Sequence, residues 1–159
     1  MAKVIAERMC AELEGDFVIF LIGMRINKLC KVWKWWPVAT AMPRMLTELS
    51  AKPELGLLAY YGAFGPHGPM VVQYWRSFDA LEAYAKAKDS EHLPAWRAFS
   101  RAVGSNGDVG IWHETYLVGA GGYENVYGNM PPFGLGEAGA LLPAQGARQA
   151  ARQRVAGAA

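Results

Sequence analysis

The stretch DFVIFLIGMRIN, residues 16–27, decides the fold class of this chain. Its even positions from Val18 to Ile26 are all apolar, and its odd positions are apolar as far as Leu21. A strand with one solvated face shows alternating apolar and polar residues, so this nearly continuous run predicts a strand that is buried on both faces. The sheet that contains it must therefore be covered on each side.

The segments that follow show first a helical pattern and then two strand patterns. Residues 33–51 place apolar side chains at helical spacing, with Pro37 suited to the first turn and Pro43 expected to kink or restart the helix. Residues 55–63 and 70–76 are typical of two strands, because a turn-rich GPHGP sequence separates two runs of apolar and aromatic residues. Together these segments predict a helix followed by a β-hairpin.

The next part of the chain repeats the order of helix and strand. A helical pattern runs from residue 78 towards residue 103, with a predicted break at 90–94 where Ser90 is a candidate N-cap. Residues 109–118, VGIWHETYLV, form the fourth predicted strand. The order β-α-β-β-α-β predicts an α+β fold of the ferredoxin-like type, in which both helices cover one face of an antiparallel four-stranded sheet.

The patterns divide the chain into an N-terminal extension (1–15), a ferredoxin-like domain (16–119), a Gly/Pro/aromatic flap (120–136) and an Ala/Arg-rich tail (137–159). The flap carries much apolar area, so we expect it to close a pocket mouth or to reach across to a partner chain. The tail has little to bury and is expected to be a marginal helix or disordered. Its removal is expected to leave activity and solubility unchanged.

The composition limits the classes of function. The chain has 159 residues, of which 52% are hydrophobic and 19% are charged, as expected for one folded domain. Its formal net charge of +2 is accounted for by the residues from Glu137 onward, and the preceding body is neutral with charges of both signs scattered along it, which argues against nucleic acid as a partner. The longest apolar run, 17–24, is too short to span a membrane, and the charges in residues 1–15 argue against a signal peptide. We therefore expect a cytoplasmic protein with no membrane partner.

The predicted sheet is apolar on both faces, whereas the helices of this topology cover only one. In residues 57–61 and 70–72, apolar or aromatic side chains occupy both sets of alternating positions. A bare apolar sheet face would be larger than the exposed patches that monomers normally tolerate. The sequence therefore predicts a homodimer in which two sheets pack face to face and form a barrel.

Five blocks of the sequence carry a resemblance to a known family. The chain resembles the fumagillin-pathway monooxygenase-like family, also catalogued as a domain of unknown function, in FLIGMRIN (20–27), VQYWRSF (72–78), HLPAWRAF (92–99), GIWHETY (110–116) and YGNMPPFGLG (127–136). The resemblance implies a branch of the dimeric α+β barrel superfamily, which includes cofactor-free antibiotic-biosynthesis monooxygenases and several haem-binding enzymes. It supports the fold more firmly than the activity, because one fold hosts many functions.

His92 is the first candidate for a catalytic residue. On a helical projection it shares one face with Trp96 and Phe99, so its imidazole is expected to point towards the apolar side. A neutral imidazole in an apolar cavity can act as a general base. The resemblance implies that His92 corresponds to a second-helix histidine that serves in the pocket, or binds haem, in several superfamily members. The alternative is a core histidine bonded to a backbone carbonyl.

His113 is the second catalytic candidate. Its neighbour Glu114 points to the opposite face of the strand, so only one of the two side chains can face a given cavity. The alternative for both is a hydrogen bond within the sheet or at the dimer interface. Six residues at strand ends or in aromatic positions are candidates for binding a substrate, namely Arg25, Asn27, Tyr74, Arg76, Trp96 and Trp112. Exposed salt bridges and ordinary core packing are the alternatives for these six.

Three functions remain open. The leading hypothesis is a small dimeric monooxygenase-like oxidoreductase that needs no cofactor and acts on an apolar, polyketide- or terpenoid-like molecule between helices and sheet. The second is a haem-binding enzyme, dehydratase-like or oxygenase-like, with His92 as axial ligand. The third is a non-catalytic dimer that binds a small ligand. The chain lacks a nucleophile elbow, a P-loop and a dinucleotide fingerprint, and its His and Cys residues show no metal-ligand spacing.

Overall fold

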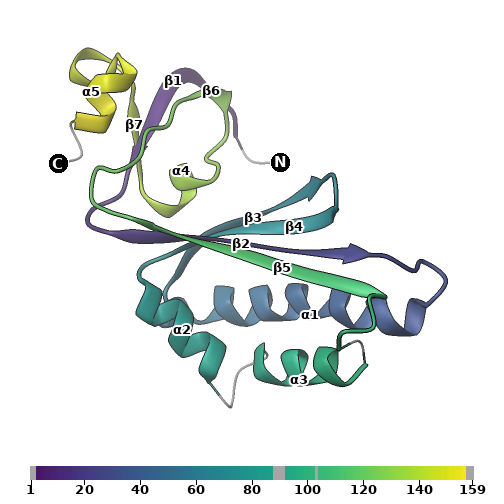
Figure 1. Cartoon of the computed structure of the whole chain (residues 1–159). Helices are drawn as coiled ribbons and strands as arrows, with labels where there is room; N and C mark the ends of the chain where they lie inside the picture. Colours follow the sequence, from purple (N-terminus) through teal and green to yellow (C-terminus); the bar gives the residue numbers. More distant parts are fainter. Residues whose placement is uncertain (1–2, 88–91, 103, 157–159) are drawn as a thin grey trace.

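The computed structural model describes residues 3–87, 92–102 and 104–156, and within them two antiparallel sheets are present (Figure 1). The larger sheet has the strand order β3-β4-β2-β5. Its strands are β2 (Phe17–Ile26), β3 (Leu57–Gly65), β4 (Gly68–Trp75) and β5 (Val109–Val118). Strand β2 pairs with β4 on one side and with β5 on the other. This interior position explains why its sequence is apolar at both sets of alternating positions.

Three helices lie along one face of this sheet (Figure 1). They are α1 (Val32–Ala51), α2 (Phe78–Lys86) and α3 (His92–Ala102), and a 3-10 turn, η1 (Pro53–Leu55), leads into β3. The predicted β-α-β-β-α-β order and the α+β, ferredoxin-like class are confirmed, with the second helical region divided into α2 and α3. The predicted N-cap Ser90 lies outside the described residues.

Helix α1 continues without interruption through Pro37 and Pro43. Of the two alternatives predicted for Pro43, a kink or a restart, the restart is therefore wrong, and Pro37 lies beyond the first turn in which it was predicted because the helix already begins at Val32. A proline inside a helix leaves one carbonyl of the preceding turn without its usual partner. For Pro43, that carbonyl belongs to Ala39, which is half-buried and lines the open cleft described below, so water can satisfy it and the helix is not forced to end.

The main core lies between the three helices and the larger sheet. Its buried members are Val18, Ala41, Met45, Leu49, Trp75, Leu81 and Tyr84. Trp75 is 1% exposed, and its indole N–H donates to Oε1 of the buried Gln73 at 2.8 Å, so its polar group is satisfied inside the core. Ser77 caps α2, because its Oγ accepts a hydrogen bond from the backbone N–H of Ala80 at 3.1 Å.

Both ends of the described chain join in a second, smaller sheet. Its strand order is β6-β1-β7, formed by β1 (Ile5–Glu12), β6 (Tyr127–Met130) and β7 (Ala140–Pro143). A short helix, α4 (Leu135–Ala138), precedes β7, and a 3-10 turn, η2 (Gly146–Arg148), and α5 (Ala151–Ala156) follow it. The strands β1 and β7 in the extension and the tail were not predicted by the sequence patterns, whereas α5 agrees with the marginal helix that was one of the two expectations for the tail.

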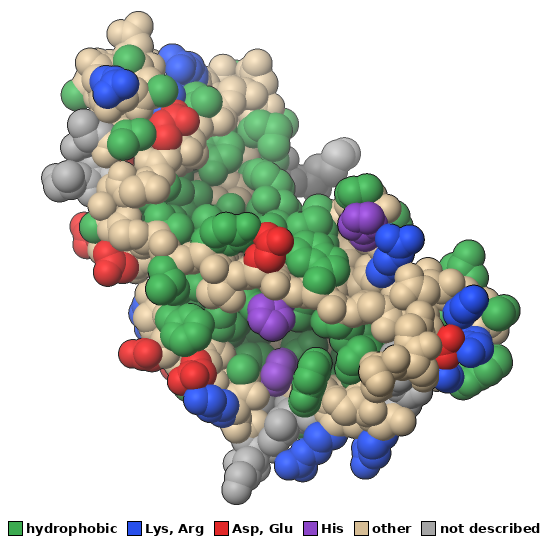
Figure 2. Space-filling model, in the orientation of Figure 1, with side chains coloured by type: hydrophobic (Ala, Val, Ile, Leu, Met, Phe, Trp, Pro, Cys, Tyr) green, Lys and Arg blue, Asp and Glu red, His purple; other side chains and the backbone are tan. Residues whose placement is uncertain are grey.

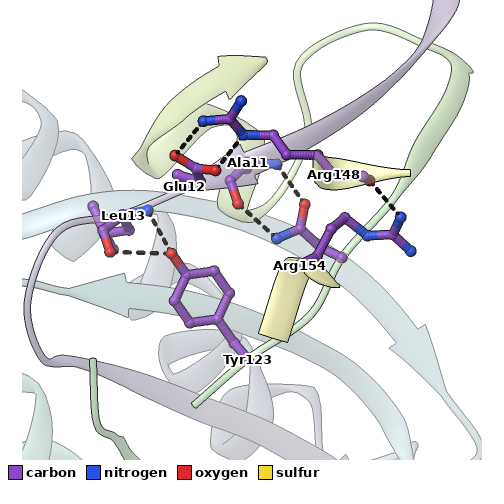
Figure 3. Close-up of polar contacts among 7 residues, drawn as sticks. Ala11, Glu12, Leu13, Tyr123, Arg148 and Arg154 are labelled. Carbon is purple, nitrogen blue, oxygen red and sulfur yellow. Dashed lines mark hydrogen bonds and ion pairs between the residues drawn. The ribbon is translucent and has the colours of Figure 1, made fainter. Parts of the chain in front are cut away.

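Polar contacts hold this small sheet to the loop before β6 (Figure 3). The Tyr123 hydroxyl accepts a hydrogen bond from the Leu13 N–H (2.6 Å) and donates to the Leu13 carbonyl (3.1 Å). Arg148 Nε donates to Glu12 Oε1 at 2.5 Å, and this contact lowers the pKa of the Glu12 carboxyl. Arg154 Nε donates to Glu124 at 2.7 Å. The described part of the tail is therefore attached to the rest of the fold by β7 pairing and ion pairs, although Ala144 is the only one of its described residues that is buried.

The segment at 120–136 covers the face of the larger sheet that lies away from the helices. Leu135 and Phe17 form a buried cluster with Tyr74, Tyr123 and Tyr127 packed around it. This position does not agree with closure of a pocket mouth between helices and sheet, and the alternative, that the flap reaches across to a partner chain, stays a prediction. Instead, the chain itself covers part of the sheet face that the sequence argument assigned to a partner.

Candidate functional site

A large apolar cleft lies between the three helices and the larger sheet, with a volume of about 990 Å³. Figure 2 shows hydrophobic side chains gathered around a hollow on this face, with histidine side chains among them. The floor is formed by alternate residues of β2 and β5, because the register pairs Phe20 with Thr115, Ile22 with His113 and Met24 with Ile111. Period-two alternation therefore places these side chains on the cleft side of the sheet.

His92 lines this cleft at the first residue of α3 and is half-buried. Its Nδ1 lies 2.9 Å from the carbonyl oxygen of Ala85, next to the carboxyl end of α2. A carbonyl can only accept a hydrogen bond, so Nδ1 carries the proton. In the neutral ring the lone pair is then on Nε2, so this nitrogen is the one that is free to accept a proton or bind a metal. His92 therefore makes the hydrogen bond to a backbone carbonyl that was expected of a purely structural core histidine, and it also faces the cleft.

His113 lines the same cleft from its floor in β5. Its side chain is exposed, and its ring centroid lies 5.5 Å from that of Phe20. Glu114 points to the opposite face, where it accepts a hydrogen bond from the Tyr116 hydroxyl at 2.6 Å and raises the pKa of Tyr116. Of the two neighbours, His113 is therefore the one that faces the cleft, and two histidines from separate elements meet at one cavity.

Trp96 and Phe99 extend the apolar wall from α3. Their rings are stacked, with centroids 5.7 Å apart, and Trp96 is 51% exposed. His92, Trp96 and Phe99 thus share the helical face that their spacing predicted. An exposed aromatic surface beside a cleft is available for contact with a bound apolar molecule.

Tyr74 and Trp112 do not line this cleft. Trp112 is adjacent to His113 in β5, so alternation places it on the other face, where its indole covers Gly23 so closely that a Cβ there would lie 2.6 Å from the ring. Tyr74 belongs to the cluster under α4, and burial raises its pKa far above the ordinary value for a tyrosine. The aromatic residues that the sequence grouped together are therefore divided between the two faces of the sheet.

The three polar candidates at strand ends make contacts that fix loops. Arg25 Nη1 lies 2.9 Å from His67 Nδ1, Asn27 Nδ2 donates to the Gly107 carbonyl at 3.0 Å, and Arg76 Nη2 donates to the Glu54 carbonyl at 2.8 Å. None of Arg25, Asn27 and Arg76 is among the described residues that line the cleft.

Sequence reasoning missed two parts of the cleft. Met42 and Met45 of α1 line it, although their helical spacing indicated only a core face. Gly62 of β3 also lines it, and a Cβ at that position would meet nothing within 4 Å. A glycine in the interior of a strand often marks a place where space beside the strand is needed, and this signal was available in the sequence.

An ion-pair cluster lies beside the cleft. Lys34 lines the cleft and its Nζ lies 2.5 Å from Asp108 Oδ2, while Lys31 Nζ lies 2.8 Å from Oδ1 of the same carboxylate. The two lysines lower the pKa of Asp108. Within residues 3–87, 92–102 and 104–156, no three His, Cys, Asp or Glu side chains are grouped so as to hold a metal ion.

No helix among the described residues is both long enough and apolar enough to cross a membrane.

Comparison with known sequences gives a family match over residues 17–135, to the family described as monooxygenase af470-like. Monooxygenase af470 from Aspergillus fumigatus is 27% identical to this chain over 131 residues. The aligned region covers 77% of this chain and 46% of that protein. The chain therefore spans about half the length of this curated relative.

Solved structures with a related arrangement of elements are more distant in sequence. SnoaB, a cofactor-independent oxygenase from Streptomyces nogalater, is 12% identical with a TM-score of 0.44, covering 64% of this chain and 91% of that chain. A dimeric protein of unknown function with a ferredoxin-like fold, from Bacteroides fragilis, is 13% identical with a TM-score of 0.45, covering 63% of this chain and 94% of that chain.

Proposed function

Because the chain belongs to the monooxygenase af470-like family, we propose that it is a monooxygenase-like oxidoreductase acting on an apolar small molecule bound in the cleft. The family match spans residues 17–135 and so includes every helix and strand that lines the cleft. The observation that carries the proposal is His92, whose Nδ1 is held by the Ala85 carbonyl and whose Nε2 is left as the basic nitrogen at an apolar wall.

The size and lining of the cleft suggest the class of substrate. Its volume of about 990 Å³ is at the upper end of pockets for drug-sized molecules. Its surface is mostly aliphatic and aromatic, and its polar lining includes the two histidines, which are suited to orienting a keto or phenolic oxygen. These features favour a polyketide- or terpenoid-like molecule with one polar edge.

The proposed reaction needs a base and molecular oxygen. Nε2 of His92 accepts a proton from a methylene group that neighbouring carbonyl or aromatic groups make acidic. The resulting carbanion reduces O₂ and forms a carbon–oxygen bond, and the peroxide oxygen takes up a proton. Loss of water from this hydroperoxide leaves a carbonyl, so one oxygen atom enters the product and the other leaves as water. In this proposal His113, which lines the same cleft, donates a hydrogen bond to the enolate oxygen.

Oxygen uptake measured with a fused-ring ketone that carries an activated methylene tests this proposal. We expect His92→Gln to lower the rate roughly 10²–10⁴-fold, because glutamine keeps a donor but accepts no proton. The melting temperature of each variant must be measured in parallel, since His92→Ala leaves a cavity as well. A stable His92→Gln variant with full activity would exclude His92 as the base and transfer the role to His113.

An absorbance spectrum distinguishes the haem-binding alternative from the cofactor-free enzyme. In that alternative Nε2 of His92 would hold the haem iron, which would supply oxygen or dehydration chemistry. A Soret band in protein produced with haem available, lost in His92→Gln, supports that alternative over the cofactor-free one. A third outcome supports the non-catalytic dimer that binds a small ligand: the unchanged protein and His92→Gln both bind ligand, and neither turns it over.

The homodimer remains part of the proposal. Tyr116 and Met130, which are 50% and 39% exposed, belong to the part of the molecule on the side of the larger sheet away from the helices. Because α4 and its neighbours cover only some of that face, a second copy is the simplest cover for the rest.

A further inference from the structure

The beginning of α1 exposes a group of large apolar side chains. Leu29 and Trp33 are 73% and 69% exposed, and Trp36 and Val32 are 58% and 47% exposed. Trp36 follows Val32 by four residues and Trp33 by three, so its side chain is a neighbour of both on the helix surface. Four such residues within eight positions form one patch, called here the tryptophan patch, whereas isolated exposed apolar residues are ordinary.

The tryptophan patch is held in place by Trp35. The Trp35 indole N–H donates to the Leu29 carbonyl at 3.0 Å, and its ring packs against the buried cluster of Met24 and Val109. One tryptophan therefore anchors the turn before α1, while Trp33 and Trp36 remain on the outside. The side chains of the tryptophan patch are therefore exposed although the segment that carries them is packed against the core.

The tryptophan patch is interleaved with positive charge. Residues 17–47 contain five Lys or Arg residues and no Asp or Glu. Lys28, Lys31 and Lys34 alternate with the apolar residues of the patch, and Asp108 neutralises one of these charges through its contacts with Lys31 and Lys34. Figure 2 shows Lys and Arg side chains together with hydrophobic ones at this end of the molecule.

This combination favours a lipid surface over a protein partner. The cores of protein interfaces are depleted in lysine, whereas tryptophan and lysine together are typical of segments at the membrane–water boundary. The indole rings enter the headgroup region and the lysines attract anionic lipids. The sequence argument against a membrane partner rested on the lack of a long apolar run. That argument applies to crossing a bilayer and not to binding at its surface.

We propose that the tryptophan patch docks this protein on the surface of an anionic lipid bilayer. Lys34, which lies between Trp33 and Trp36, and the following residues Pro37 and Val38 of the same helix line the cleft. Docking therefore brings one side of the apolar cleft close to the bilayer, where an apolar substrate of the kind proposed above would be dissolved. The docking itself does not depend on the proposed oxidation and is tested without substrate.

Flotation of the full-length protein with lipid vesicles is the test. We expect binding to vesicles of phosphatidylcholine mixed with phosphatidylserine, weaker binding to pure phosphatidylcholine, and release by added salt. Tryptophan emission should shift to the blue on binding. The variant Trp33→Ala/Trp36→Ala should bind about tenfold or more weakly, because it removes the two largest exposed surfaces. Lys28→Glu should bind the anionic vesicles roughly tenfold more weakly.

Matched variants separate the patch from general effects. Leu117→Ser changes an apolar residue that is 71% exposed in β5, and Lys3→Glu changes an exposed lysine before β1. Both should bind vesicles like the unchanged protein. Failure of the unchanged protein to bind anionic vesicles would overturn the proposal, as would patch variants that bind normally. If vesicle binding is absent and the double tryptophan variant changes the mass in light scattering, the patch is an interface between copies instead.

Discussion

At the residue scale, the cleft depends on which side chains fill each row across the sheet. The register aligns Gly62, Val71, Ile22 and His113 in one row from β3 to β5. Three positions of this row carry side chains on the cleft floor, and the fourth is a glycine with open space above it. The room for a ligand at the β3 end of the cleft is therefore set by the absence of one side chain.

Filling that space should weaken the binding of bulky ligands. In Gly62→Leu the new side chain enters the cleft without a clash at Cβ, so the fold should remain as stable or become more stable. We expect the affinity for a large apolar fluorescent probe to fall roughly tenfold, about 1.4 kcal/mol, measured by titration. Gly128→Leu in β6, which also has no atom near its Cβ, is the matched control and should bind normally. Unchanged binding in Gly62→Leu would show that the probe does not occupy this end.

Asp108 should make the stability of the fold sensitive to acid. Its two lysine partners hold its pKa in the folded state below the ordinary value. A lowered folded-state pKa means that the contacts stabilise the fold above about pH 4 and are lost as the pH falls through the folded-state pKa. We expect Asp108→Asn to lower the melting temperature at pH 7, with a smaller difference from the unchanged protein at acid pH.

The control for this prediction is Glu7→Gln, which removes an exposed carboxylate in β1. Its melting temperature should follow that of the unchanged protein at every pH. A difference between Asp108→Asn and the unchanged protein that stays constant down to strongly acidic pH would contradict the role of the Asp108 charge.

At the element scale, the sequence predicted the larger sheet and its helices because their patterns are local. Residues 17–24 are apolar enough to indicate a buried strand, and the helical face that contains His92, Trp96 and Phe99 follows from spacing alone. The small sheet could not be predicted in the same way. Strand β6 is a four-residue YGNM segment and β7 is an equally short ALLP segment, and each is too short for alternation to be recognised.

The division of the candidate site between two faces was only partly accessible from sequence. Adjacent residues such as Trp112 and His113 must point to opposite faces, and that rule is independent of the structure. Which face holds the cleft depends on where the helices lie and on the register between β2, β4 and β5. Tyr74 could not be assigned because its environment is formed by Tyr127 and Leu135, more than fifty residues away in the sequence.

Removal of the tail should destabilise the protein, contrary to the expectation from composition. A chain that ends after Gly136 loses β7 and also Arg148, so β1 has an unpaired edge and Glu12 loses its ion-pair partner. We expect a melting temperature roughly 5–10 °C lower, and a greater tendency to aggregate through the free edge. A chain that ends after Gln145 keeps β7 and should show an intermediate effect. Equal melting temperatures for all three proteins would contradict the role of β7.

At the scale of the whole molecule, a homodimer through the larger sheet is expected to be measurable in solution. Light scattering should give twice the mass of the chain. Tyr116→Glu places a second negative charge beside Glu114 on the face away from the helices, and it should shift the mass towards that of the monomer. The matched control is Leu117→Glu, the next residue on the opposite face, which should remain dimeric. A folded monomer for the unchanged protein at low concentration would contradict the dimer.

The small sheet also has a consequence for how the protein is made. Every backbone partner of β1 lies more than a hundred residues further along the chain, in β6 and β7. At ordinary ribosomal speeds, β1 is therefore synthesised roughly 6 to 25 seconds before β7 exists to pair with it. The larger sheet can form in that interval, while both edges of β1 are still unpaired. We therefore expect a molecular chaperone, or rapid completion of synthesis, to reduce aggregation mainly by protecting the unpaired edges of β1.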